Sequence, residues 1–185
     1  MKVMKSLFVV QGSDFEKGSI VERLNRLLLL VDFGNEEKKV YLANSGALST
    51  VLKPGREILC RHVSKSGRKT EYNAFAVRVD DIYVTVKSTF ANTVFLELFE
   101  RGYLEPFSGY TLTSREPPFP DGGRADFLLE GNNGKSFIEV KSCTHVENGI
   151  AKFPDRPTKR GRRHLRTLTS LAENGTGAHL FFVVQ

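Results

Sequence analysis

The chain has 185 residues, of which 40% are hydrophobic, so it is long enough for one large domain or two small ones and too apolar for a disordered polymer. Lys and Arg outnumber Asp and Glu by 27 to 21, so the surface should favour polyanions, either nucleic acid or an anionic membrane. The longest apolar run, residues 27–31, is too short to span a bilayer, and residues 1–15 lack the features of a secretory signal. We therefore expect a cytoplasmic protein that does not bind membranes. The two cysteines form no CxxC pair, which argues against a disulfide scaffold and a structural zinc site.

Residues 1–83 alternate short β-rich runs with turn-forming segments. A small barrel is predicted from this pattern, and specifically an OB-like barrel, because barrels of this kind commonly bind single-stranded nucleic acid. The pattern alone fits a small barrel without a ligand equally well. The β-rich runs lie at residues 6–10, 19–33, 38–43, 56–63 and 72–79, separated by turns that contain Gly, Asn or Pro.

Residues 84–185 carry helical as well as strand patterns. Apolar residues spaced as on one face of a helix follow Ser88 and Thr89 and continue to about Gly102, which predicts a packing helix. The predicted fold class is therefore α+β, with an OB-like barrel over residues 1–83 and an α/β domain over residues 84–185. The other predicted elements of this domain are a Pro-rich loop at 115–123, strands at 126–130 and 136–140, a helix at about 158–173 and a strand at 178–185.

The segment 124–142 predicts a hairpin with ionisable side chains on its second strand. Side chains alternate between the faces of a strand, so Glu139 and Lys141 share one face. If residues 131–136 form the turn, antiparallel pairing sets Asp126 across from Lys141 and one diagonal step from Glu139. Cross-strand neighbours lie about 5 Å apart and diagonal neighbours about 7–8 Å apart, close enough for two carboxylates to hold one divalent cation.

An acid pair beside an amine is a constellation for phosphodiester cleavage. Mg²⁺ or Mn²⁺ binds oxygen ligands, here Asp126 and Glu139, and would activate a water for attack on phosphorus. Lys141 would stabilise the charge that develops on the phosphate or orient the water. The spacing is weak evidence by itself, because a Glu/Lys pair on a surface strand is very common.

Residues 152–166 form a basic segment that leads into the second predicted helix. It contains seven Lys or Arg and one Asp, a density that favours contact with a phosphate backbone. Asp155 is predicted to cap the helix, and Arg160 and His164 are predicted to share a face beside its core stripe that looks into the site. A solvated basic helix face is the alternative interpretation. The predicted core stripe consists of Leu165, Leu168 and Ala172.

Several short motifs occur in order from about residue 20 to the end of the chain. They are Asn44-Ser45-Gly46, Ala91-Asn92, Ser108-Gly109-Tyr110, Arg124-Ala125-Asp126, Ile138-Glu139-Val140-Lys141-Ser142, Phe153-Pro154-Asp155, Arg160-Gly161 and His164-Leu165. In this combination the chain resembles the sugar fermentation stimulation protein A family. The resemblance implies an N-terminal OB-like domain, a C-terminal PD-(D/E)xK restriction-endonuclease-like domain and sequence-nonspecific DNA binding. Members of the family usually continue beyond the strand that ends at Gln185, and the stretch before residue 20 matches them poorly.

The resemblance also assigns roles to individual residues, among them Glu116, which resembles an upstream acid of the family. The expected site consists of Asp126, Glu139 and Lys141 as catalytic residues, Asp126, Glu139 and Glu116 as metal ligands, and Arg124 and Asp155 as supporting residues. The residues expected to contact nucleic acid are Lys152, Arg156, Lys159, Arg160, Arg163 and His164.

Two functions from different classes are consistent with these patterns. The first is a metal-dependent nuclease acting on DNA or RNA, and the second is a DNA-binding regulatory protein whose nuclease-like domain does not cut. The presence of Asp126, Glu139 and Lys141 together favours the nuclease, because a pure binder has no need for carboxylates that repel phosphates. DNA is the expected partner. The alternatives left open are single- or double-stranded DNA as the partner, and a monomer or a homodimer as the assembly.

Overall fold

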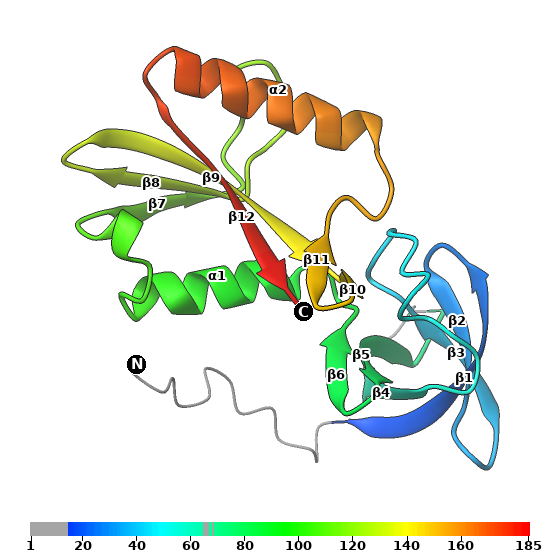
Figure 1. Ribbon diagram of the computed structural model, residues 1–185. Coiled ribbons are helices and arrows are strands. Elements are labelled where there is room, and N and C mark those ends of the chain that lie inside the picture. The colour runs from blue at the N-terminus through cyan, green and yellow to red at the C-terminus, as the bar shows by residue number, and fades with distance from the viewer. Residues whose placement is uncertain (1–14, 65–66, 68) are drawn as a thin grey trace. The chain divides into compact units, whose positions relative to one another are not determined.

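The computed structural model describes residues 15–64, 67 and 69–185, which form two compact units (Figure 1). The barrel unit consists of the described residues up to Phe90 together with residues 143–156 and 184–185, and the α/β unit consists of residues 91–142 and 157–183. The units thus alternate along the chain, whereas the sequence suggested a single boundary after residue 83. The strand predicted at 6–10 lies outside the described residues.

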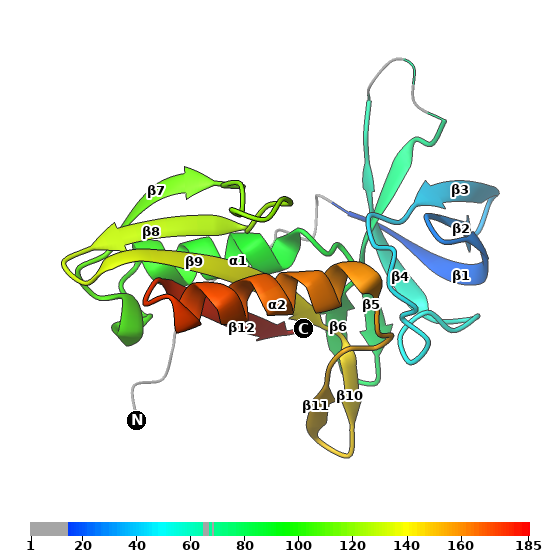
Figure 2. The same ribbon diagram turned by 90° about the horizontal axis from the view of Figure 1, so that it is seen from above.

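The described part of the barrel unit contains a six-stranded sheet in the order β3-β2-β1-β4-β5-β6. A parallel pairing of β3 with β5, which sets Val40 beside Tyr72, closes the first five strands into the predicted OB-like barrel (Figure 2). Alternation along β2 buries Leu29 and Val31 inside the barrel. The strands are β1 (Glu16–Asn25), β2 (Leu28–Asp32), β3 (Glu37–Tyr41), β4 (Glu57–His62), β5 (Tyr72–Val79) and β6 (Ile82–Thr85).

The β-rich run at 19–33 forms two strands and not one. Asn25 pairs with Leu28, so only Arg26 and Leu27 form the turn between β1 and β2. The side chain of Asn25 stabilises this turn, because its Oδ1 accepts a hydrogen bond from the Leu27 N–H at 2.9 Å. Asn25, a turn-forming residue in the middle of this β-rich run, was the sign of a break that the prediction missed.

A hairpin of β10 (His145–Glu147) and β11 (Ile150–Lys152) belongs to the barrel unit and was not predicted. Its turn residues, Asn148 and Gly149, both have positive φ, at 52° and 75°. An Asn-Gly pair is well suited to this conformation and is a recognised hairpin signal. After the hairpin, Asp155 Oδ2 accepts a hydrogen bond from the Leu48 N–H at 2.8 Å, which links the segment to a loop of the barrel.

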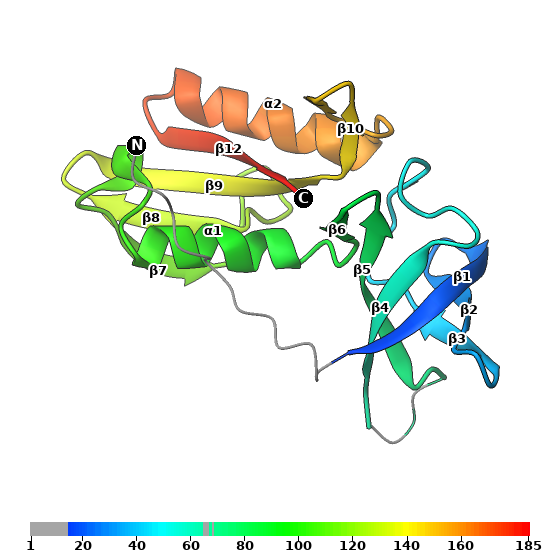
Figure 3. The ribbon, with the colours of Figure 1, turned by 60° about the horizontal axis from the view of Figure 1, so that its bottom comes forward.

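The α/β unit is built on a four-stranded sheet in the order β12-β9-β8-β7. Its helices cover opposite faces of this sheet (Figure 3). Phe95 of α1 packs with Ile138, whereas Leu168 of α2 packs with Phe137, and these neighbours on β9 point to opposite faces. The elements are α1 (Phe90–Glu100), a 3₁₀ turn (Glu105–Phe107), β7 (Thr111–Arg115), β8 (Phe127–Gly131), β9 (Gly134–Cys143), α2 (Lys159–Glu173) and β12 (Gly177–Val184). Within the described ranges, none of the helices has the length and apolar composition needed to cross a membrane.

The second predicted helix is present as α2, but its cap and core face differ from the prediction. Thr158 is the N-cap, and its hydroxyl accepts a hydrogen bond from the Gly161 N–H at 3.0 Å, so the prediction that Asp155 caps the helix was wrong. Leu165 is 48% exposed and Ala172 is also exposed, so the predicted core stripe was wrong at both positions. The face that packs on the sheet instead carries the residues His164, Thr167, Leu168 and Leu171.

Candidate active site

The pairing of β8 with β9 brings the two predicted acids together in a register different from the predicted one. Gly131 pairs with Gly134, so the turn contains only two residues and the six-residue turn predicted at 131–136 was wrong. Phe127 consequently pairs with Ile138, and the Asp126 N–H donates to the Ile138 carbonyl at 3.0 Å. This register sets Asp126 beside Glu139, and not across from Lys141 as predicted.

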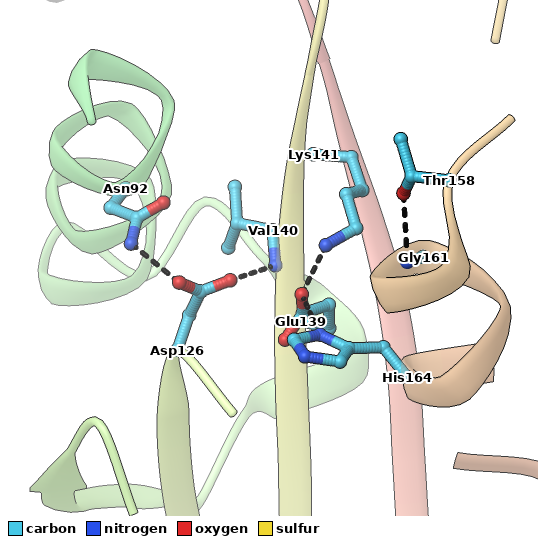
Figure 4. A network of polar contacts seen from close by, with 8 residues as sticks. All are labelled: Asn92, Asp126, Glu139, Val140, Lys141, Thr158, Gly161 and His164. Atoms are coloured by element: carbon cyan, nitrogen blue, oxygen red, sulfur yellow. Dashed lines mark hydrogen bonds and ion pairs between the residues drawn. The ribbon is translucent and has the colours of Figure 1, made fainter. Parts of the chain in front are cut away.

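Asp126, at the start of β8, is held by two donors on the side of the sheet that faces α1. Its Oδ1 accepts from the Asn92 amide of α1 at 2.8 Å, and its Oδ2 accepts from the Val140 N–H at 2.7 Å (Figure 4). Burial raises the pKa of Asp126, and the negative charge of Glu139 raises it further. The hydrogen bonds from Val140 and Asn92 and the charge of Lys141 oppose this shift without cancelling it. Ionising Asp126 therefore costs more free energy here than it does in water.

Glu139, in the middle of β9, is turned toward α2 and is only 3% exposed. Its Oε1 lies 2.6 Å from Nδ1 of His164 and also accepts from the ammonium of Lys141 (Figure 4). Its Oε2 is buried and has no hydrogen-bond partner among the residues that the structure describes. Among the described residues, Oε1 therefore has two hydrogen-bonding partners, His164 and Lys141, whereas Oε2 has none.

His164 was predicted to lie on a helix face that looks into the site, but its burial and its bond to Glu139 were not predicted. Sequence reasoning placed it among the residues that contact nucleic acid, yet it is 2% exposed and its hydrogen-bond partner is Glu139. The ring of Phe119 packs edge-on against its imidazole with centroids 5.6 Å apart. One turn along α2, the Thr167 hydroxyl donates to Asp121, in the same loop as Phe119. The signal in the sequence was the spacing of His164, Thr167, Leu168 and Leu171, which fits one face of a helix.

Glu116 lies next to Asp126 along the backbone, where its N–H donates to the Asp126 carbonyl at 2.9 Å, but its side chain points to the surface. Its side chain is 76% exposed and lies 3.8 Å from Arg124, the predicted supporting residue. Among the described residues, no group of three or more His, Cys, Asp or Glu side chains is arranged to hold a metal ion. The structure therefore brings together Asp126, Glu139, Lys141 and His164, and leaves Glu116 and Arg124 at the surface.

The basic residues of segment 152–166 are all exposed. In the barrel unit, Lys152 forms an ion pair with Glu147, its neighbour in the β10–β11 hairpin. In the α/β unit, Lys159 and Arg160 occupy the first turn of α2, where the helix dipole also favours anions. Arg163 lies against the backbone of Gly123. These side chains are available to solvent, as contact with a phosphate backbone requires.

Comparison with known proteins identifies the family. Residues 21–86 match a family model described as the SfsA N-terminal OB domain, and residues 89–185 match one described as the sugar fermentation stimulation protein RE domain. The chain belongs to the sugar fermentation stimulation protein family. The family suggested by the motifs is thus confirmed, and so is the predicted fold class, an OB-like barrel followed by an α/β domain.

Members of this family from bacteria and archaea align with most of the chain. A sugar fermentation stimulation protein homolog from Caldanaerobacter subterraneus subsp. tengcongensis is 39% identical over 172 residues, which are 91% of this chain and 73% of the relative. A homolog from Methanothermobacter thermautotrophicus is 36% identical over 168 residues, which are 91% of this chain and 70% of the relative. The solved structure of Pyrococcus furiosus SfsA in complex with Ca²⁺ has a TM-score of 0.87 at 28% identity and covers 97% of this chain and 75% of its own.

Proposed function

We propose that this protein is a divalent-metal-dependent nuclease that binds DNA, with Asp126 and Glu139 as metal ligands. The observation that carries the proposal is the Oε2 atom of Glu139, which is buried without a hydrogen-bond partner in the described part of the chain. A buried carboxylate oxygen without a hydrogen-bond partner costs free energy. Such atoms are rare in proteins unless an ion or a water molecule interacts with them. A cation bound at Glu139 would offset this cost.

The donor set of the site fits a hard divalent cation. Carboxylate oxygens are the ligands that Mg²⁺, Mn²⁺ and Ca²⁺ prefer, and here the register of β8 and β9 sets the acids Asp126 and Glu139 at neighbouring positions. Burial raises the pKa of Asp126 most and the negative charge of Glu139 raises it further, and a positive ion would oppose both by favouring the ionised carboxylate. The Ca²⁺ in the structure of the Pyrococcus furiosus relative supports a divalent cation in this family, and we propose Mg²⁺ or Mn²⁺ here.

The chain's own residues then have distinct roles in phosphodiester hydrolysis. A bound ion supplies Lewis acidity, which polarises the phosphate and lowers the pKa of water. Lys141 is paired with Glu139 but its side chain is 22% exposed, so its ammonium has access to solvent and to an incoming phosphate. There it would stabilise the negative charge that develops on the phosphate oxygens. The exposed basic residues of α2 would hold the flanking phosphates.

A DNA-binding protein that does not cut is the second candidate, and one observation favours it. Both oxygens of Asp126 already accept hydrogen bonds, from Asn92 and Val140, and within the described residues no cluster of three metal-ligating side chains is present. This arrangement fits a nuclease-like site whose Asp126 carboxylate is held by hydrogen bonds and binds no metal ion. The basic surface of α2 serves DNA binding in either case.

Cleavage assays separate the two candidates. The purified chain is incubated with labelled single- and double-stranded DNA and RNA in the presence of Mg²⁺, Mn²⁺ or EDTA. We expect metal-dependent cutting that Glu139→Gln lowers by more than the roughly 10–100-fold typical of a residue that only supports a metal ligand. Glu130→Gln is the matched control, because Glu130 lies on the same hairpin in a partly exposed ion pair with Lys135. Unchanged DNA binding without cutting under any of these conditions would reject the nuclease and leave the binder.

A further inference from the structure

We propose that His164 is the positioning residue for Glu139. Its imidazole holds Oε1, so that Oε2 is the oxygen presented to a metal ion and Lys141 is free to change partners. This inference rests on the proposed function, since it concerns Glu139 as a metal ligand. The sequence predicted that His164 contacts nucleic acid. The role proposed here is different, because His164 acts through the side chain of Glu139.

The contact between the two side chains is short and shielded from water. Nδ1 of His164 lies 2.6 Å from Oε1 of Glu139, and the two side chains are 3% and 4% exposed. A hydrogen bond from an imidazole N–H to a carboxylate is among the stronger ones in proteins, and a low local dielectric strengthens it. Such a bond fixes the rotation of the carboxylate about its last torsion angle.

The ring that makes this bond is itself held in place. The ring of Phe119 packs edge-on against the imidazole. A hydrogen bond from the Thr167 hydroxyl to Asp121 holds the loop that contains Phe119 against the same face of α2. Nε2 of His164 is buried and has no partner among the described residues, so Nδ1 provides the ring's one described hydrogen bond. A neutral ring that donates from Nδ1 carries no proton on Nε2. The structure therefore assigns the proton to Nδ1.

The second donor to Oε1 explains why a rigid partner is needed. Lys141 also binds this oxygen, but its ammonium sits on a flexible four-carbon chain and must leave Glu139 in order to meet a phosphate. If Lys141 were the sole donor, Glu139 would lose its orientation at the moment the substrate arrived. His164 keeps Oε1 bonded throughout, in the way that supporting groups orient metal ligands in other sites.

The test compares Mn²⁺ binding, measured by calorimetry on the full chain without nucleic acid, in wild type and three variants. His164→Leu removes the donor, whereas His164→Asn keeps an amide N–H close to the position of Nδ1. We expect His164→Leu to weaken Mn²⁺ binding by roughly 10–100-fold and His164→Asn to retain most of the affinity. Leu171→Ala is the control for loosening of α2, because it removes a partly buried apolar side chain from the same helix face two turns beyond His164, and it should leave the affinity unchanged.

A spectroscopic measurement on the metal-free wild type adds a readout that does not depend on folding of the variants. In the wild type, the ¹⁵N signals of His164 should show a proton on Nδ1. A ring protonated only on Nε2 overturns the inference.

The outcomes distinguish failure of this inference from failure of the proposed function. If the wild type binds Mn²⁺ and both His164 variants bind it equally well, or are weakened equally, the positioning role is overturned and the metal site stands. If the wild type binds no divalent cation, the proposed function fails and the inference fails with it.

Discussion

The two units of this protein differ in what they bury. The core of the barrel unit is an apolar cluster of residues such as Leu29, Val31 and Ile58. In the described part of the chain, the four buried polar or charged residues all belong to the α/β unit, and they are Ser136, Glu139, His164 and Thr167. Apolar side chains would fill the same positions without the cost of desolvation. The difference supports a functional reason for the polar groups beneath α2.

The cost of such burial is large on the scale of protein stability. Removing a carboxylate from water costs several kcal/mol, and its partners recover this only if every lone pair is satisfied. In the α/β unit the compensation is incomplete, because Glu139 Oε2 and His164 Nε2 have no partner among the described residues. The barrel core should therefore respond to mutation as an apolar core does. In the α/β unit, which has an apolar cluster on the α1 face, the buried polar pair beneath α2 should respond as an incompletely satisfied network.

The largest expected effect tests the apolar side of this comparison. Leu29→Ala removes a fully buried side chain and should lower the free energy of unfolding by about 2–5 kcal/mol, since the cavity left behind cannot fully collapse. Leu27→Ala is the matched control, two residues away and 41% exposed, and should cost no more than about 0.5 kcal/mol. Urea denaturation measures both variants. Equal losses in the two would show that the barrel core does not govern its stability.

The next effect tests the buried polar residues of the α/β unit, and here the free energy of unfolding should not fall. Replacing the buried pair together, with Glu139→Met and His164→Leu in one protein, should leave the stability unchanged or raise it by about 1–4 kcal/mol. The reason is that two imperfectly satisfied polar groups are exchanged for apolar ones of similar size. The same protein should lose metal binding. A double variant that is much less stable than wild type would mean that the network contributes to the fold more than it costs.

The sequence predicted the parts of the site that depend on local pattern. Alternation along one strand was enough to place Glu139 and Lys141 on a common face, and helical spacing was enough to find α1 and α2. The register of the β8–β9 hairpin was missed because it depends on turn length, and Asn132-Asn133 forms a two-residue turn where a longer one was expected. A shift of two residues preserves the face of each side chain but changes its partner.

The predicted core face of α2 shows a different limit. The stripe Leu165, Leu168 and Ala172 and the observed stripe both fit helical periodicity, and they differ by a rotation of about one residue. The observed stripe is the one whose side chains have partners in the rest of the unit, through apolar packing and through the buried hydrogen bond between His164 and Glu139, which no local pattern contains. A buried position for the polar residue His164 would be unfavourable without its partner, Glu139, which the helical spacing does not reveal.

The smallest expected effect concerns Asp155 and returns to the barrel unit. Leu48 is 2% exposed, and its N–H has Asp155 Oδ2 as acceptor, so Asp155→Ala should leave a buried donor unsatisfied at a cost of about 1–3 kcal/mol. Asp155→Asn keeps an acceptor oxygen and should cost less. Hydrogen exchange locates the damage, and we expect faster exchange at the Leu48 amide in Asp155→Ala but at the Gly161 amide in Thr158→Ala. Faster exchange at Gly161 in Asp155→Ala would instead restore Asp155 as the cap of α2.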